Sequence, residues 1–311
     1  MLLSLFAASI GSQTFFAIGL TERLSEQLRS DYLARGAVQY ALLSLERDAT
    51  ATVDGLSEAW ADNPGVFQHH ALGGGTFGIV AREEAGVPPR YGLVDEERRI
   101  SLNAAPAEVL QRLFEIAGGL REDEAEQLAA AVEDWRDEDD KERPQGAEGI
   151  YYRSLSDAYD CKNGPFENAE ELLLLRGVTP KLYRRLEPYL TVYGSGLLNL
   201  NTTSRTALQA LGLSPIGVEG LIAFRSGEDG AEGTPDDRQL VSIEGLESQL
   251  RAFVPVEDLA RLSRFAKAGI FGVGSSDFRT FIQADTGRPA SRVQVSCVLS
   301  REGEIKLWSE R

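Results

Sequence analysis

The chain has 311 residues, with 48 acidic and 32 basic side chains and a formal net charge of -16. This balance argues against binding to nucleic acid or anionic membranes through charge, because phosphate affinity depends on clustered lysine and arginine. Apolar residues make up 42% of the chain and charged residues 26%, which is typical of a folded protein, and the length suggests about two domains. With two cysteines and two histidines, zinc fingers, Cys/His redox centres and disulfide-dense scaffolds are not expected.

The N-terminal segment has no charged side chains. Residues 1–21 carry no charged side chain, and Glu22 begins a segment rich in Glu, Arg and Asp. About 20 uncharged residues can cross a bilayer as a helix, although positions 9–14 of this run are largely polar. The run favours a membrane helix. A helix buried against other protein and a degraded secretion signal are the alternatives.

The helical pattern continues beyond this run. No proline precedes Pro64, and apolar residues keep a three-to-four spacing from Leu20 to Leu45. The spacing predicts one helix over residues 2–48, which would be ~70 Å long at 1.5 Å per residue. Such a helix is either a membrane anchor with a stalk or a spine whose second half supports a small sheet.

Strand-like runs lie on both sides of a helical middle. Alternating apolar residues in 73–86 and 90–103 predict two strands of an antiparallel sheet, and 278–285, 292–300 and 305–308 predict three more near the C-terminus. Because strands flank the helical segment, we expect the middle of the chain to be an insertion into the sheet.

One segment repeats at an offset of 98 residues, since ISLNAAPAEVLQRL at 100–113 aligns without gaps with LNLNTTSRTALQAL at 198–211. Each copy passes from a short strand through a Leu-Asn turn into a helix, and Asn103 is predicted to cap the first helix. Capped amphipathic helices can resemble one another by chance. The alternative is a pair of related helical modules.

The second copy continues into LGLSPIGVEGLIAFR, which resembles a helix-hairpin-helix element of the kind that grips nucleic-acid backbones. Arg225 is the only basic residue near this hairpin in the sequence, and the segment 226–237 that follows is acidic. A structural, SAM-like use of the hairpin is therefore favoured over DNA binding.

The surplus of negative charge gathers in two segments. The first, around 134–148, lacks the glycine and glutamate of an EF-hand loop, so a solvated acidic face is the simpler interpretation and a cation site the alternative. The second alternates acids with Gly and Pro, and glycine permits the tight turns that bring oxygens to calcium distances. The candidate ligands are Asp229, Glu232, Asp236 and Asp237 in the second segment and, more weakly, Asp134, Asp137, Asp139 and Asp140 in the first.

Other reactive side chains give no clear site. The adjacent His69 and His70 have no third ligand in the sequence, and a hydrolase triad around 275–277 has no evident histidine. A bond between Cys161 and Cys297 is possible in an oxidising compartment. No enzymatic activity is predicted.

Several unusual phrases occur in a fixed order after the long helix: VEDWRDEDD, GAEGIYYRS and NGPFENAEELLLLRGVTPKLYRRLEPYLTVYGSGLLNLNT. Together they resemble the minor pseudopilin K family of the type II secretion system, from about residue 30 to the C-terminus and most specifically in 133–153 and 164–203. The resemblance implies an α+β, pilin-like fold: a long N-terminal helix on an antiparallel sheet, with a large inserted all-α domain of SAM-like, helix-hairpin-helix-like modules. The expected domains are a membrane or spine helix at 1–50, the pseudopilin sheet at 51–103 and 266–311, an inserted α domain at 104–190, and a second helical module with the acidic loop at 191–265.

The resemblance also implies a function. The protein would be anchored in the inner membrane by a single helix, with its bulk in the periplasm. It would cap the pseudopilus shaft together with the minor pseudopilins I and J, nucleate assembly, and aid export of folded proteins, with possible contact to these substrates but none to nucleic acid. The family uses calcium, which favours Ca²⁺ at the acidic loops. A membrane-anchored helix-hairpin-helix DNA receptor is the alternative.

The N-terminus departs from the pattern that the resemblance implies. Family precursors begin with a short basic leader that ends in glycine, and none precedes Met1. Counted back from Tyr32, the helix is about ten residues shorter than the mature helix that the resemblance implies, so we expect a misassigned start or a truncation.

Overall fold

The computed structural model describes residues 2–84, 87–287 and 292–310. In this described part, the chain divides into two compact units. Unit 1 comprises Met1–Asp48, Ala59–Val94 and Arg279–Arg311, and unit 2 comprises Ala49–Glu58 and Asp95–Phe278. The chain therefore leaves unit 1 and returns to it twice.

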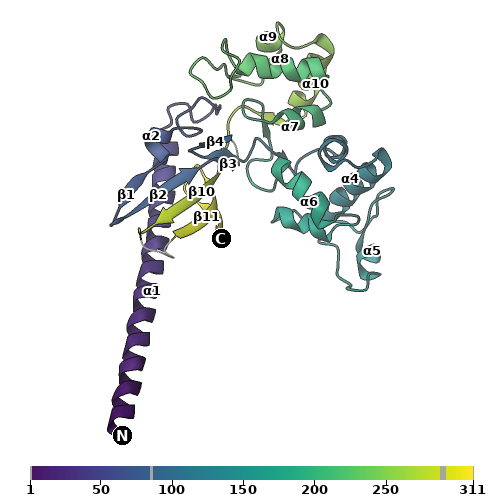
Figure 1. The fold of residues 1–311 in the computed structure, drawn as a ribbon. Coiled ribbons are helices and arrows are strands. Elements are labelled where there is room, and N and C mark those ends of the chain that lie inside the picture. Colours follow the sequence, from purple (N-terminus) through teal and green to yellow (C-terminus); the bar gives the residue numbers. More distant parts are fainter. Residues whose placement is uncertain (1, 85–86, 288–291, 311) are drawn as a thin grey trace. The chain divides into compact units, whose positions relative to one another are not determined.

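Unit 1 is organised by the helix α1 (Leu2–Glu46), so the single long helix predicted from the apolar spacing is confirmed. Its C-terminal half packs against the strands β2 and β11, and the small side chains of Ala34, Ala37 and Ala41 are fully buried there. The N-terminal half extends past the sheet (Figure 1). No helix among the described residues combines the length and the apolar character needed to span a membrane.

The sheet of unit 1 follows the order β1-β2-β10-β11-β12, and β5 pairs with β10 beside this path. The pairs β1–β2, β2–β10 and β11–β12 are antiparallel, with Phe281 opposite Val80 and Cys297 opposite Trp308. The strands are β1 (His70–Leu72), β2 (Gly75–Val80), β5 (Val94–Asp95), β10 (Asp277–Asp285), β11 (Arg292–Ser300) and β12 (Ile305–Glu310). The three predicted C-terminal strands are confirmed, and the last is two residues longer than expected.

The two strands predicted before the helical region differ from expectation. The run 73–86 provides β2 and the start of a separate hairpin, β3 (Arg82–Glu84) with β4 (Val87–Arg90); residues 85–86 lie outside the described part. The run 90–103 does not form one strand. It splits into β5 and the two-residue strand β6 (Ile100–Ser101), because the buried carboxylate of Asp95, the last residue of β5, accepts a hydrogen bond from the main chain of Glu97 and turns the chain there.

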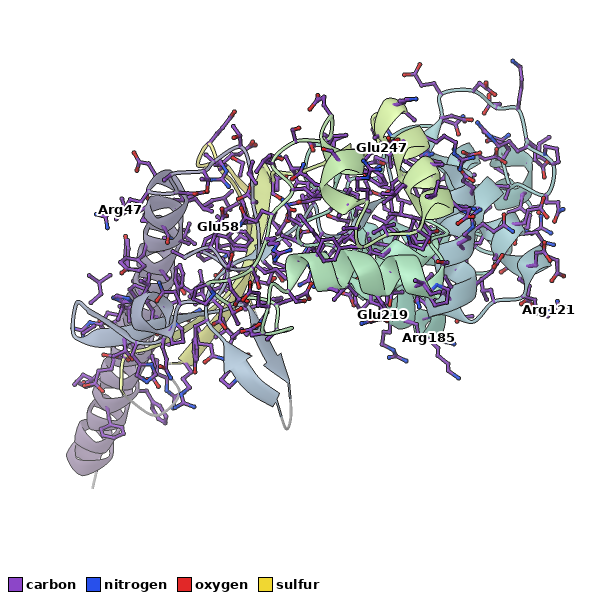
Figure 2. All side chains as sticks on the ribbon, turned by 90° about the horizontal axis from the view of Figure 1, so that it is seen from above. Arg47, Glu58, Arg121, Arg185, Glu219 and Glu247 are labelled. Atoms are coloured by element: carbon purple, nitrogen blue, oxygen red, sulfur yellow. The ribbon has the colours of Figure 1, made fainter. Side chains whose placement is uncertain are left out.

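Unit 2 is mainly helical around one hydrophobic core that runs from Ile100 to Phe271. Charged side chains such as Arg121, Arg185, Glu219 and Glu247 point away from its helices (Figure 2). Its helices and helical turns are α3 (Ala107–Leu113), η1 (Phe114–Gly118), α4 (Glu122–Arg136), α5 (Gly149–Arg153), η2 (Ala169–Leu174), α6 (Pro180–Leu186), η3 (Glu187–Tyr189), α7 (Arg205–Ala210), α8 (Pro215–Arg225), α9 (Leu246–Leu250) and α10 (Val256–Lys267). In unit 1, α2 spans Pro64–Phe67.

The segments that align at an offset of 98 residues make the same contacts in two places. β6 pairs in parallel with β7 (Leu190–Thr191), and β8 (Leu198–Asn199) pairs in parallel with β9 (Phe271–Gly272). Asn103 exchanges two hydrogen bonds with the main chain of Phe166, at 2.9 and 2.7 Å. Asn201 does the same with Leu240, at 3.0 and 2.7 Å. These shared contacts support two related modules rather than a chance likeness.

An arginine closes each module at the last residue of its second helix, Arg136 in α4 and Arg225 in α8. Each guanidinium donates to two main-chain carbonyls at equivalent positions of the aligned segments. The bonds join Arg136 to Leu102 (2.6 Å) and Ala105 (2.9 Å), and Arg225 to Leu200 (3.0 Å) and Thr203 (2.8 Å). The end of each second helix is thereby tied to the turn before the first.

Two predictions about these modules were wrong. Asn103 does not cap a helix: Pro106 occupies the N-cap of α3, because the Asn103 amide is bonded to Phe166. The hairpin between α7 and α8 also has more basic neighbours than the sequence suggested. A Cβ on Gly212 would lie 2.5 Å from the Arg261 guanidinium and 3.1 Å from that of Arg112, and both arginines come from other helices.

Unit 2 buries carboxylates at the point where the chain enters it. Asp95 is 1% exposed and accepts hydrogen bonds from Asn199 (3.0 Å), the main chain of Glu97 (2.7 Å) and Thr202. Burial, followed by the nearby charge of Glu97, raises the pKa of Asp95 to about 6. Glu97 in turn accepts from the main chain of Ser276 at 2.8 Å.

We expect Asp95 to make unit 2 more stable in acid. Its pKa in the folded state lies above the ordinary 3.8, so its contribution is full below that value and is lost as the pH rises through about 6. Relative to Asp95→Asn, the wild type should lose about 1–3 kcal/mol of unfolding free energy between about pH 4.5 and 7.5. Urea unfolding followed by Trp135 fluorescence measures this difference. Equal pH slopes in both proteins would contradict it.

Candidate functional site

An acidic loop follows the closing arginine of each module. The first acidic loop comprises residues 137–148 and the second residues 226–237. Both belong to unit 2. Because Arg136 and Arg225 are equivalent, the two loops occupy equivalent positions in the related modules.

The first acidic loop is anchored by Asp134, which is fully buried in the last turn of α4. Its carboxylate accepts from the main-chain N–H groups of Arg143 (3.2 Å) and Ala147 (2.9 Å). Gly146 makes this closure possible, since a Cβ there would lie 1.9 Å from Oδ2 of Asp134. Asp134 therefore holds the returning end of the loop.

Three carboxylates surround the guanidinium of Arg143. It lies 3.1 Å from Glu133 and 3.0 Å from Asp134, and it also bonds to Asp137. The hydrogen bonds to Asp137 and then Asp134 raise the pKa of Arg143. This cation offsets the repulsion among the carboxylates that crowd the end of α4.

Three acceptor oxygens near the same helix end have no hydrogen-bond partner among the described residues: Oδ1 of Asp137, Oε1 of Glu148 and Oδ1 of Asn163. Glu148 is only 2% exposed, and burial raises its pKa. The Cys161 thiol links the set, because it interacts with the Glu148 carboxylate and with the main chain of Asn163. Buried acceptors without donors are what a bound cation would satisfy.

The remaining predicted residues of the first acidic loop lie outside this set. Asp139 accepts from the main chain of Lys141 at 2.8 Å, and Asp140 accepts from the Asn163 amide at 2.8 Å. Both aspartates are exposed. The structure thus brings Asp134 and Asp137 together around Arg143 and leaves Asp139 and Asp140 at the surface.

The second acidic loop binds its own backbone. Asp236 accepts from the main chain of Glu228 (2.6 Å) and Asp229 (3.1 Å) and from the Thr234 hydroxyl (2.8 Å). These bonds, that of Thr234 first, lower the pKa of Asp236 to about 2. Asp237 accepts from Gly233 at 2.7 Å. Hydrogen bonds from within the loop therefore stabilise the ionised form of the Asp236 carboxylate.

The other two predicted ligands of the second acidic loop point to different partners. Glu232 forms an ion pair with Arg225, and Asp229 accepts from the main chain of Ala231 at 2.8 Å. Among the described residues, neither acidic loop gathers three carboxylate oxygens within 4.8 Å of one another. The four predicted side chains therefore hold the loop in shape through their own contacts. In this arrangement, they do not converge on one position that a cation could occupy.

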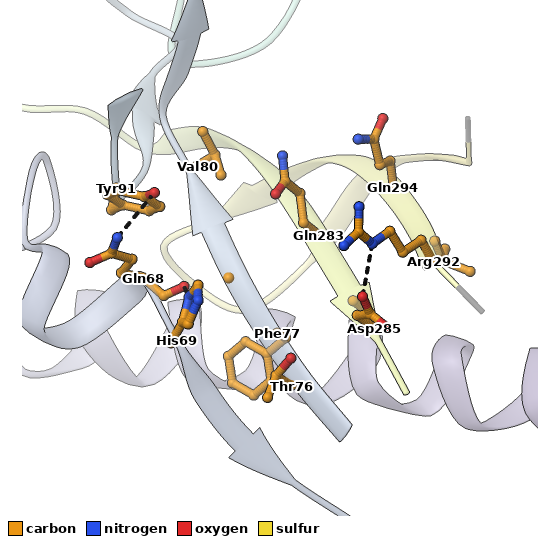
Figure 3. Close-up of a pocket in the computed structure, with 13 residues that line it drawn as sticks. Gln68, His69, Thr76, Phe77, Val80, Tyr91, Gln283, Asp285, Arg292 and Gln294 are labelled. Carbon is orange, nitrogen blue, oxygen red and sulfur yellow. Dashed lines mark hydrogen bonds and ion pairs between the residues drawn. The ribbon is translucent and has the colours of Figure 1, made fainter. Parts of the chain in front are cut away.

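Unit 1 carries a separate hollow of about 250 Å³ on its sheet, between β2, β10 and β11 (Figure 3). Its wall is polar: Gln68 donates to the Tyr91 hydroxyl at 3.3 Å, and Arg292 pairs with Asp285 at 2.8 Å. Since the charges of this pair offset each other, the hollow suits an uncharged polar group. His69 also lines it, while the neighbouring His70 packs between aromatic rings of unit 1.

Both cysteines are free thiols in the described structure. Cys161 is half-buried beside the first acidic loop, and Cys297 is buried in β11. Burial raises the pKa of each thiol to about 12. Neither thiol is therefore activated as a nucleophile.

Comparison with known families gives a match to protein K of the type II secretion system over residues 91–195. Over this third of the chain, the sequence matches that family. The matched residues include β6, α3, α4 and the first acidic loop, and the resemblance found in the sequence is confirmed.

Proteins named type II secretion system protein K are similar over part of their length. That of Klebsiella pneumoniae is 38% identical over 101 residues, 32% of this chain and 30% of the relative. That of Pectobacterium carotovorum subsp. carotovorum is 32% identical over 123 residues, 40% of this chain and 37% of the relative. These matches span about a third of each relative. A putative protein K of Escherichia coli K12 is 26% identical over 66% of this chain and 64% of its own length.

A solved structure shares the fold across nearly the whole chain. A chain of the GspK-GspI-GspJ complex from enterotoxigenic Escherichia coli matches with a TM-score of 0.66 and 17% identity. The match covers 96% of this chain and 99% of that chain. The mixed helical and sheet architecture is therefore shared with a chain of that complex.

Sequence reasoning singled out the acidic segment within the protein K match and, of its three buried acceptors, only Asp137. Glu148 and Asn163 were not among the predicted ligands, because nothing in their spacing shows that their oxygens are buried. The offset of 98 residues was the available signal for Arg136 and Arg225, since it aligns the turns that they close.

Gly146→Ala should destabilise unit 2 by at least about 2 kcal/mol, because the new Cβ displaces Asp134 from the returning main chain. Gly230→Ala is the control in the second acidic loop. No described atom lies within 4 Å of its Cβ position, and its φ of +72° costs only about 1 kcal/mol. Urea unfolding at neutral pH measures both. A Gly146→Ala effect no larger than the control would contradict the anchoring role.

Proposed function

We propose that this protein is a minor pseudopilin that assembles with the minor pseudopilins I and J at the tip of the type II secretion pseudopilus. The match of residues 91–195 to the protein K family carries the proposal. The fold shared with a chain of the GspK-GspI-GspJ complex supports it. In this role the protein nucleates the filament, caps its shaft and aids export of folded proteins across the outer membrane.

The arrangement of the chain supports a pilin-like fold with an insertion. α1 packs on the sheet of unit 1, and the chain leaves that sheet for Asp95–Phe278 before completing it. In a filament of packed helical spines, a segment of this size has room only where no further subunit stacks above it. The tip is therefore the favoured position.

The free half of α1 supports contact with apolar partners. Phe15, Phe16 and Leu20 are 78%, 76% and 60% exposed. Exposed apolar stretches of this kind mark protein or membrane contacts. We assign this half to the neighbouring pseudopilin helices and the inner membrane, with the bulk of the chain in the periplasm.

The full chain, co-expressed with its I and J partners and purified in detergent, should run as one complex by size-exclusion chromatography with light scattering. Leu28→Asp, at a position 56% exposed on α1, should weaken this complex at least about tenfold without changing the melting temperature of the free chain. Ile216→Asp, 71% exposed in unit 2, is the control and should leave it intact. If the three wild-type proteins stay separate at micromolar concentration, the proposed assembly is wrong.

We also propose that the acidic loops bind Ca²⁺, which prefers carboxylate and carbonyl oxygens. The first acidic loop fits the ion best, because Asp137, Glu148 and Asn163 each present a buried oxygen without a donor. Asp229, Asp236 and Asp237 would serve the second loop, where hydrogen bonds to the carboxylates leave further lone pairs available. The ion would supply fixed positive charge that holds these loops closed.

Calcium should raise the melting temperature of the wild type by about 5 °C over an EDTA-treated sample, because the ion binds the folded state. Glu148→Gln should weaken calcium binding at least about tenfold in titration calorimetry, since it removes a buried anionic ligand. Glu142→Gln is the matched control at an exposed position of the same loop. No heat and no thermal shift for the wild type at millimolar Ca²⁺ would refute calcium binding.

A further inference from the structure

The guanidinium of Arg143 occupies the place where the carboxylates of the first acidic loop are most crowded. It bonds to Glu133, Asp134 and Asp137, which come from the end of α4 and the start of the loop. Its own main-chain N–H also binds Asp134 at 3.2 Å. One residue therefore joins the start of the loop to its returning half.

The contacts around Arg143 divide the oxygens of the loop into two groups. Both carboxylate oxygens of Asp134 accept hydrogen bonds, which come from Arg143 and Ala147. Asp137 gives one oxygen to Arg143, while its other oxygen and Oε1 of Glu148 remain without partners among the described residues. Arg143 thus neutralises part of the acidic cluster and leaves a preformed set of acceptors.

The second acidic loop reaches its shape by other means. No Lys or Arg occurs between residues 226 and 237. Asp236 and Asp237 are held by the backbone and by Thr234, and three glycines of the loop have positive φ. The arginine is therefore a feature of the first loop rather than a general requirement of the module.

We propose that Arg143 is a built-in counter-ion of the first acidic loop, which keeps that loop folded while no divalent cation is bound. The inference rests on the calcium binding proposed above and concerns its regulation. With the guanidinium in place, calcium meets a loop that is already closed. Without it, the repulsion among Glu133, Asp134 and Asp137 opens the loop, and closure then depends on calcium.

Hydrogen exchange of the main-chain amides in residues 137–148, measured on the full chain with EDTA and with millimolar CaCl₂, tests this role. In EDTA, Arg143→Gln should exchange at least about tenfold faster than the wild type. Calcium should restore most of the protection. Arg121→Gln is the control: it removes the same charge at the start of α4, from a side chain that is 72% exposed and points outward (Figure 2), and it should exchange like the wild type.

The outcomes separate this inference from the calcium proposal. If calcium changes neither the wild type nor Arg143→Gln, calcium binding itself is wrong. If the wild type responds but Arg143→Gln is equally protected in EDTA, or is equally exposed with and without calcium, the counter-ion role is wrong. Should Arg143→Gln fail to fold in both conditions, Arg143→Lys decides. It keeps the charge with fewer bonds and should retain most of the protection in EDTA, whereas loss of that protection despite the retained charge would overturn the proposal.

Discussion

The helical unit depends on a positive charge carried into the protein interior. Arg225 is 3% exposed, and burial lowers its pKa, yet its guanidinium is paired with main-chain carbonyls and with Glu232. A buried charge is tolerated only when it is bonded in this way. Arg136 and Arg225 are the last residues of their helices, so the chain leaves each helix next to a positively charged side chain. An acidic loop follows each of these arginines.

The related modules manage the repulsion between carboxylates differently. The first loop relies on a side-chain cation and on a glycine that admits Asp134. The second relies on main-chain N–H groups that glycine-rich turns direct at Asp236 and Asp237. A guanidinium fixes the geometry through several bonds at once, whereas backbone donors leave carboxylates exposed to solvent. The same surplus of negative charge therefore gives one partly buried loop and one open loop.

Local patterns were sufficient for the outer elements of the fold. The alternation of β10 and β11 and the apolar spacing of α1 define these elements to within about two residues of the structure. Predictions failed where a side chain meets a distant partner: the Asn103 amide bonds to Phe166, 63 positions away. The same limit applies to the candidate site. Acidic composition located both loops, but the burial of Glu148 and the position of Arg143 among three carboxylates arise only when α4 and the loop pack together.

The parallel pairs β6–β7 and β8–β9 join the first and last residues of each module. The chain therefore enters and leaves a module at adjacent strands, about 4.8 Å apart. β7 ends at Thr191 and β8 begins at Leu198, so the second module starts almost where the first closes. A segment with neighbouring ends behaves as a cassette. Copies can be gained, lost or exchanged during evolution while the flanking chain keeps its attachment points, which gives the large helical unit a simple route of origin.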